Sequence, residues 1–129
     1  MVAQAMGGLM YVTGTPEGGP LRAGIQVADL CSGLFGAIGI LVALLDREAT
    51  GEGRWVQTSL LQAQVAMLDF QAVRWLVDGV VPGRTGNDHP YMTPMGVYPA
   101  ADREIVIGAS GQEQYRKFCS ALGAPELLD

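Results

Sequence analysis

Three side chains in this sequence could take part in covalent or acid–base chemistry. Asp29 comes directly before a run, from Leu30 to Leu45, that contains no ionised residue. Cys31 follows two positions later, and His89 is the only histidine among the 129 residues. A carboxylate or thiol at the start of a helix can act as a nucleophile, because the helix N-terminus stabilises negative charge.

Asp29 has a structural and a catalytic interpretation. Aspartate is favoured at helix N-caps, where its carboxylate accepts hydrogen bonds from the free N–H groups of the first turn. The same position would keep the carboxylate ionised and stabilise charge that develops nearby during a reaction. The residues alone leave both interpretations open, and the N-cap is the more common of the two.

The other two side chains favour structural interpretations. Cys31 has no obvious histidine partner, and small buried cysteines are common in core helices. His89 lies in a loop rich in Gly, Pro and Asn, where an exposed or capping role is the default. One histidine without a cysteine pair at ligand spacing argues against a zinc site. No glycine-rich phosphate-binding motif is present, so we expect no metal and no permanently bound cofactor.

Composition excludes further classes of protein. A hydrophobic fraction of 49% with 16% charged residues indicates a folded chain. The net charge of −5, the single lysine and the scattered arginines argue against a nucleic-acid partner. Two cysteines form no disulfide framework, which indicates reduced thiols and a cytoplasmic location. The uncharged run of residues 30–45 is shorter than the roughly 20 residues of a spanning helix, so we expect a buried core helix and no membrane partner.

Periodicity and turn signals place these residues on elements. They predict helices over residues 30–47, 62–78 and 112–122. Extended segments are expected at residues 25–27, 55–60, 96–98 and 105–107. Glycines recur at every third position of the first helix, at Gly33, Gly36 and Gly39. Because a helical glycine costs about 1 kcal/mol relative to alanine, they need a reason. Close packing of a neighbouring segment is favoured over close approach of a ligand.

The predicted elements give an α/β chain with two parts. Residues 1–78 would form the central part of a large α/β domain, residues 79–86 a linker with Pro82 and several glycines, and residues 87–129 the beginning of a small α/β domain. The first part has too few strands for a sheet of usual size. We therefore expect its partner strands to come from residues outside this sequence or from another chain.

Several runs along the chain, in order, resemble the class III coenzyme A transferases, the family of formyl-CoA transferase and carnitine CoA-transferase. The runs are Gln4–Met10, Val27–Gly33, Leu44–Arg54, Val56–Leu61 and Gly83–Pro90. The resemblance implies the middle of a longer family fold: an incomplete piece of a Rossmann-like large domain followed by the start of a smaller α/β domain. It also implies a homodimer or other self-association.

The resemblance implies that Asp29 is the catalytic nucleophile. The carboxylate would attack an acyl-CoA thioester to give a mixed anhydride, which CoA converts into an aspartyl-CoA thioester before a carboxylic acid takes over the CoA. The coenzyme A thioester is then a substrate, and this chain alone is expected to be inactive. Two alternatives stay open: an acyl-CoA racemase, which would pair the aspartate with a histidine outside this sequence, and a truncated, non-catalytic association module.

Overall fold

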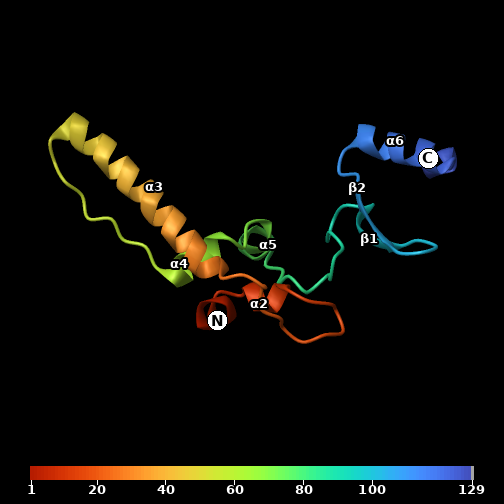
Figure 1. Ribbon diagram of the computed structural model, residues 1–129, viewed down its shortest axis with the longest axis horizontal. Helices are drawn as coiled ribbons and strands as arrows, with labels where there is room; N and C mark the ends of the chain where they lie inside the picture. Colours follow the sequence, from red (N-terminus) through yellow and green to blue (C-terminus); the bar gives the residue numbers. More distant parts are fainter. Residues whose placement is uncertain (129) are drawn as a thin grey trace. The chain divides into compact units, whose positions relative to one another are not determined.

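The computed structural model describes residues 1–128 and divides the chain into two compact units (Figure 1). The first unit is Met1–Arg84 and the second begins at Thr85, so the division falls within residues 79–86. Five helices form the first unit: α1 (Val2–Met6), α2 (Leu9–Val12), α3 (Val27–Thr50), α4 (Leu60–Ala66) and α5 (Phe70–Asp78). A two-stranded sheet and further helices form the second, so the chain is of mixed α and β structure.

The long helix α3 begins three residues earlier and ends three residues later than the predicted range 30–47. It ends at Gly51, whose φ of 77° lies in the left-handed region and whose N–H donates to the carbonyl of Arg47. Glycine is favoured at this C-terminal position because it has no β-carbon to clash there. With 24 residues, α3 is the dominant element of the first unit.

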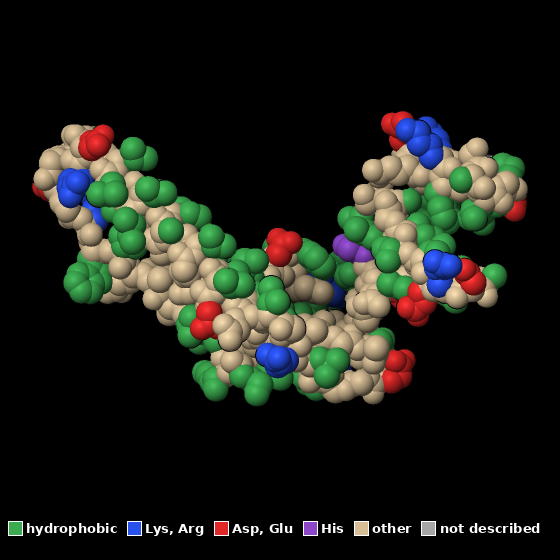
Figure 2. Space-filling model, in the orientation of Figure 1, with side chains coloured by type: hydrophobic (Ala, Val, Ile, Leu, Met, Phe, Trp, Pro, Cys, Tyr) green, Lys and Arg blue, Asp and Glu red, His purple; other side chains and the backbone are tan. Residues whose placement is uncertain are grey.

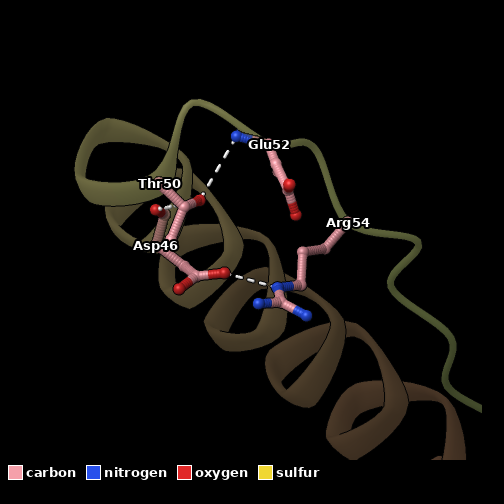
Figure 3. A network of polar contacts seen from close by, with 4 residues as sticks. All are labelled: Asp46, Thr50, Glu52 and Arg54. Carbon is pink, nitrogen blue, oxygen red and sulfur yellow. Dashed lines mark hydrogen bonds and ion pairs between the residues drawn. The ribbon is translucent and has the colours of Figure 1, made fainter.

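The predicted strand at residues 55–60 is wrong, because its sequence has no partner strand in the described part of the chain. Residues 52–59 run as an unpaired segment back along α3 (Figure 1), and the described residues give no hydrogen bond to the backbone of residues 53–58. Figure 3 shows how the segment is fastened: the guanidinium of Arg54 pairs with the carboxylate of Asp46, and the N–H of Glu52 donates to Thr50 Oγ1 at 3.2 Å.

The spaced glycines of α3 make room for this returning segment. A β-carbon at Gly39 would lie 2.8 Å from Cγ1 of Val56, which is closer than real contacts allow, and one at Gly36 would lie 3.5 Å from Cγ2 of Thr58. Close packing of a neighbouring segment therefore explains two of the three positions. At Gly33 a β-carbon would meet nothing within 4 Å.

The expectation that α3 is a buried core helix is wrong for this chain. Apolar side chains along it are more than half exposed and gather on its surface (Figure 2). Five of them recur at helical spacing along the helix: Leu30, Leu34, Ile38, Leu41 and Leu45. We call these five residues the α3 stripe. The cause is a lack of cover, since within the first unit α3 packs mainly against α4 and the returning segment.

Among the described residues, α3 is also the one helix long and apolar enough to cross a membrane, with a mean hydropathy of 2.1 over its most apolar window, of which 11% is buried. Length and composition alone give this result, and core helices of soluble proteins share it. Residues 53–58 lie against α3 with unpaired backbone groups. Hydrocarbon would leave those groups without partners, so a protein surface suits the α3 stripe better than lipid.

The single helix predicted at residues 62–78 is two helices, α4 and α5. Ser59 caps α4, because its hydroxyl accepts a hydrogen bond from the N–H of Gln62 at 3.1 Å. The break between the helices lies at Asp69, whose φ of 50° is rare for a residue with a β-carbon. Hydrophobic periodicity continues through the break, which is why the sequence suggests one helix.

The buried side chains of the first unit lie on α1, α3 and α4, which contact one another. They are small or polar: Gln4, Ala28, Cys31, Ala63 and Gln64. The amide of Gln64 is fully buried and makes no hydrogen bond within the described residues. Its side chain fills the space beside Gly7, where a β-carbon would lie 2.7 Å from Cγ of Gln64.

In the second unit, strand β1 (Met95–Pro99) pairs antiparallel with β2 (Glu104–Gly108) in the register Met95↔Gly108 to Pro99↔Glu104. Helix α6 (Gln112–Leu122) has the predicted bounds and ends at Gly123 with a φ of 65°. It is followed by the 3₁₀ helix η1 (Pro125–Leu128). The predicted extended segments at 96–98 and 105–107 are thus confirmed as the centres of the two strands.

Candidate active site

Asp29 is the third residue of α3, and the expectation that it caps the helix is wrong. The N-cap is Gln26, which makes no side-chain capping bond. The helix begins earlier because the N–H of Val27 donates to the carbonyl of Ile25 at 3.0 Å and that of Leu30 donates to Gln26 at 3.1 Å. Within the described residues the Asp29 carboxylate makes no hydrogen bond or ion pair. It is exposed and lies in the first turn of α3, where the helix dipole favours negative charge.

Gln4 holds the loop from which α3 starts. Its side chain is 4% exposed, and both polar atoms of its amide bond to the loop backbone. Nε2 donates to the carbonyl of Ile25 at 3.1 Å, and Oε1 accepts from the N–H of Ala23 at 3.0 Å. The carbonyl of Ile25 also accepts from Val27, the first residue of α3. One buried amide on α1 thus fixes the backbone that leads into the turn carrying Asp29.

Asp29 opens into a pocket of about 540 Å³, a volume within the range of small-molecule sites. Residues from α1, from the loop before α3, from the first turn of α3 and from the start of α4 line it: Met1, Val2, Ala3, Gln4, Arg22, Gln26, Ala28, Asp29 and Leu60. Most of the walls are apolar. The polar side chains among them are Gln4, Arg22, Gln26 and Asp29.

Arg22 contributes the basic side chain of this pocket. It makes no ion pair with Asp29 and no hydrogen bond within the described residues. The pocket therefore combines a free carboxylate with a free guanidinium on apolar walls. Such an arrangement can hold an anionic substrate next to a nucleophile, since guanidinium groups match the geometry of carboxylates.

The other two candidates of the sequence lie elsewhere. Cys31 is 8% exposed and does not line the pocket, so its place agrees with a small core residue. His89 belongs to the second unit. Its ring Nδ1 accepts hydrogen bonds from the backbone N–H groups of Tyr91 and Met92, both at 3.2 Å. The backbone N–H of His89 donates to the carbonyl of Met95 at 2.8 Å. Its ring thus holds a turn, which is the capping role expected for it.

No cluster of three or more His, Cys, Asp or Glu side chains that could hold a metal ion occurs in residues 1–128. Sequence reasoning missed Gln4, Arg22 and Gln26 as pocket residues. These residues share a pocket because α1 contacts α3 and α4. The spacing of residues along the sequence does not indicate such contacts. For Gln4, the signal was its place in the first of the family-like runs.

Comparison with known proteins adds an independent line of evidence on the family of this chain. The model of CoA-transferase family III matches residues 1–129. The acetyl-CoA:oxalate CoA-transferase of Acetobacter aceti is 40% identical over 127 residues, which cover 98% of this chain and 33% of that protein. The succinate–glutarate CoA-transferase of Agrobacterium fabrum is 36% identical over 128 residues, 99% of this chain and 32% of that protein.

Solved structures agree. A CAIB/BAIF family protein from Brucella suis superposes with a TM-score of 0.75 and 34% identity over 97% of this chain and 33% of its own. A hypothetical protein from Mycobacterium tuberculosis gives a TM-score of 0.79 and 29% identity, with 99% and 33% covered. The present sequence spans about a third of the length of the relatives it matches. With the match to the family model along its whole length, the chain belongs to CoA-transferase family III.

Proposed function

We propose that this chain provides the nucleophile of a CoA-transferase, and that Asp29 is that nucleophile. The observation that carries the proposal is the unpartnered carboxylate of Asp29 at the start of α3, which opens into a pocket that also contains Arg22. An aspartate that caps a helix accepts hydrogen bonds from the N–H groups of the first turn. Asp29 accepts none from the described residues, so it is available to react.

The reaction has four balanced steps. A carboxylate oxygen of Asp29 attacks the thioester carbonyl of an acyl-CoA, which expels CoA thiolate and leaves a mixed anhydride. The thiolate attacks the aspartyl carbonyl, so an aspartyl-CoA thioester forms and the donor acid leaves as a carboxylate. The acceptor carboxylate attacks that thioester and gives a second anhydride and CoA thiolate. The thiolate finally attacks the acceptor carbonyl, releasing the new acyl-CoA and restoring Asp29.

Three features of the first unit support these steps. Asp29 lies in the first turn of α3, the end of the helix that attracts anionic groups. The two hydrogen bonds of Gln4 hold the backbone before α3, which keeps the turn that carries Asp29 in place. The apolar walls of the pocket offer surface to the carbon chain of an acyl group.

The substrates of this proposal are an acyl-CoA and a carboxylic acid. The names of the two relatives specify oxalate, succinate and glutarate as acids, all of which are dicarboxylates. We take such acids as the first to test with this chain. The chain spans about a third of those relatives. We therefore also propose that the first unit is an incomplete piece of a Rossmann-like large domain, and that further parts of that domain cover the exposed face of α3.

A second function, self-association, is supported by the α3 stripe. Its five aliphatic side chains are each more than half exposed, and contiguous apolar surface of this kind favours association. Analytical ultracentrifugation of the chain and of a Leu34→Glu, Leu41→Glu variant tests it. We expect a dimer or larger species that the charges dissociate; a monomeric parent chain would contradict this second function.

The nucleophile is tested by intact-mass spectrometry after incubation with acetyl-CoA and succinyl-CoA. The chain alone is expected to be inactive in the complete transfer, but an adduct requires only the first two of the four steps. We expect a covalent acyl or CoA adduct that hydroxylamine removes, and that Asp29→Asn abolishes because an amide is a poor nucleophile toward the thioester. Cys31→Ala is the matched control, since it removes the nearest thiol and should keep the adduct. An adduct retained in Asp29→Asn, or no adduct with the parent chain, would contradict the assignment. Exchange of an α-proton for solvent deuterium without an acceptor acid would favour the racemase instead.

A further inference from the structure

The pocket of Asp29 also contains the positively charged Arg22, which the transfer of CoA to a monocarboxylic acid does not require. Arg22 lines the pocket, and its guanidinium makes no ion pair or hydrogen bond with the described residues. By contrast, Arg54 pairs with Asp46, and Arg84 donates to the carbonyls of Tyr11 and Thr15 at 3.1 and 3.2 Å. Arg22 thus keeps its donors free beside a proposed nucleophile.

We infer that the acceptor of this site is a dicarboxylate, and that Arg22 binds the carboxylate that does not react. The inference rests on the proposed function. One carboxylate of the acceptor must reach the carbonyl carbon of the Asp29–CoA thioester. The second carboxylate of a short diacid then lies a few carbon atoms away inside the same pocket, where Arg22 is the basic side chain. The planar guanidinium can bind both oxygens of that carboxylate at once.

The pocket walls fit the rest of such a molecule. Val2, Ala3, Ala28 and Leu60 offer apolar surface to the methylene groups of the acid. A carboxylate placed among apolar walls is strongly destabilised unless it is paired, and Arg22 provides the partner. A monocarboxylate of the same length would instead place a methyl group against the guanidinium and leave that charge unpaired.

The phosphates of CoA are a poorer match for Arg22. They lie at the far end of the pantetheine arm from the thiol, and the thiol must reach the Asp29 carbonyl. A cation that shares a pocket of about 540 Å³ with Asp29 is therefore near the reacting end of CoA and far from its phosphates. The side-chain amide of Gln26 lines the same pocket and can add a neutral donor to the acid.

The test compares succinate with butyrate, which has the same number of carbon atoms and one carboxylate fewer. Ligand-observed NMR titrations measure the dissociation constant of each acid with the full 129-residue chain. The variants are Arg22→Gln and, as a control, Arg116→Gln, which removes an exposed cation of α6 with the same change in charge. Hydrogen bonds to charged groups contribute enough that we expect Arg22→Gln to weaken succinate binding by roughly tenfold or more.

Butyrate binding should be weaker than succinate binding in the parent chain and nearly unchanged in Arg22→Gln. Arg116→Gln should bind both acids as the parent does. Equal losses for both acids in Arg22→Gln, an equal loss of succinate in Arg116→Gln, or no binding of succinate to the parent chain would each overturn the inference. So would a loss of CoA binding in Arg22→Gln with succinate unaffected.

The outcome is separable from that of the proposed function, because binding is measured without acyl-CoA. Selective loss of succinate in Arg22→Gln together with no adduct on Asp29 would keep the diacid site and reject the nucleophile. An Asp29 adduct together with undiminished succinate binding in Arg22→Gln would keep the nucleophile and reject the diacid site.

Discussion

The packing of the returning segment on α3 makes a graded prediction for its three glycines. Replacing a helical glycine with alanine stabilises a helix by about 1 kcal/mol when nothing opposes it. The added β-carbon meets nothing at Gly33, makes an ordinary contact with Thr58 at Gly36, and would lie 2.8 Å from Cγ1 of Val56 at Gly39. Since valine is stiff about χ1, Val56 cannot turn aside, and overpacking of this kind costs about 1–3 kcal/mol.

We therefore expect Gly33→Ala to raise the free energy of unfolding by about 1 kcal/mol. Gly39→Ala should leave it unchanged or lower it by up to about 2 kcal/mol, with Gly36→Ala in between. Urea denaturation followed by far-ultraviolet circular dichroism measures the three values. Val56→Ala removes the obstructing methyl groups, so in that background Gly39→Ala should become stabilising. Equal stabilisation by Gly33→Ala and Gly39→Ala in the parent chain would refute the packing of residues 53–58 on α3.

Three further predictions follow from single side chains. Gln4→Leu removes two hydrogen bonds and should lower the free energy of unfolding by about 1–3 kcal/mol. It should also slow the acylation of Asp29. Unchanged stability in urea would show that the two hydrogen bonds of Gln4 are not formed. Gln64→Met keeps the shape but removes an unpaired buried amide, so it should stabilise the chain by about 1–2 kcal/mol; a loss of stability would reveal a partner for that amide. Burial, followed by a hydrogen bond with Cys119, raises the pKa of Tyr115 above its ordinary value of about 10. A raised pKa favours the neutral form in the folded state, so this contribution to stability is present below pH 10 and is lost as the pH rises through the pKa of Tyr115. Absorbance titration should show one late-titrating tyrosine that disappears in Tyr115→Phe, and four tyrosines titrating together would contradict it.

Local signals located the elements that local interactions determine. The bounds of α6 were predictable because Gly123 and Pro125 end an amphipathic run in the usual way, and the two strands of the second unit are consecutive partners. The segment at residues 55–60 reads as a strand because its side chains are β-formers, but a strand needs a second backbone, and none of the described residues supplies one. The apolar face of α3 is exposed for a similar reason, because the described residues do not supply a second layer to cover it.

The candidate site divides along the same line. Asp29 could be singled out because it is the one charge before a long apolar run. Its position within α3 could not be predicted, because the start of the helix depends on the loop that Gln4 holds by hydrogen bonds. Arg22 could not be found from spacing, since its importance comes from sharing a pocket with residues of α1, α3 and α4. Residues that line such a pocket are related by tertiary contact and not by sequence interval.

The measurement that tests the central claim most directly identifies the atom that carries the acyl or CoA group. Hydroxylamine removes thioesters of cysteine as well as those of aspartate, so Cys31, two residues from Asp29, must be excluded at the level of peptides. Borohydride reduces an aspartyl-CoA thioester to the alcohol, which converts aspartate into homoserine and leaves an acylated cysteine as the free thiol. After incubation with acyl-CoA, reduction and proteolysis, we predict homoserine at position 29. Unmodified aspartate at that position, with the acyl group found on Cys31 or Cys119 in a parallel sample that was not reduced, would contradict it.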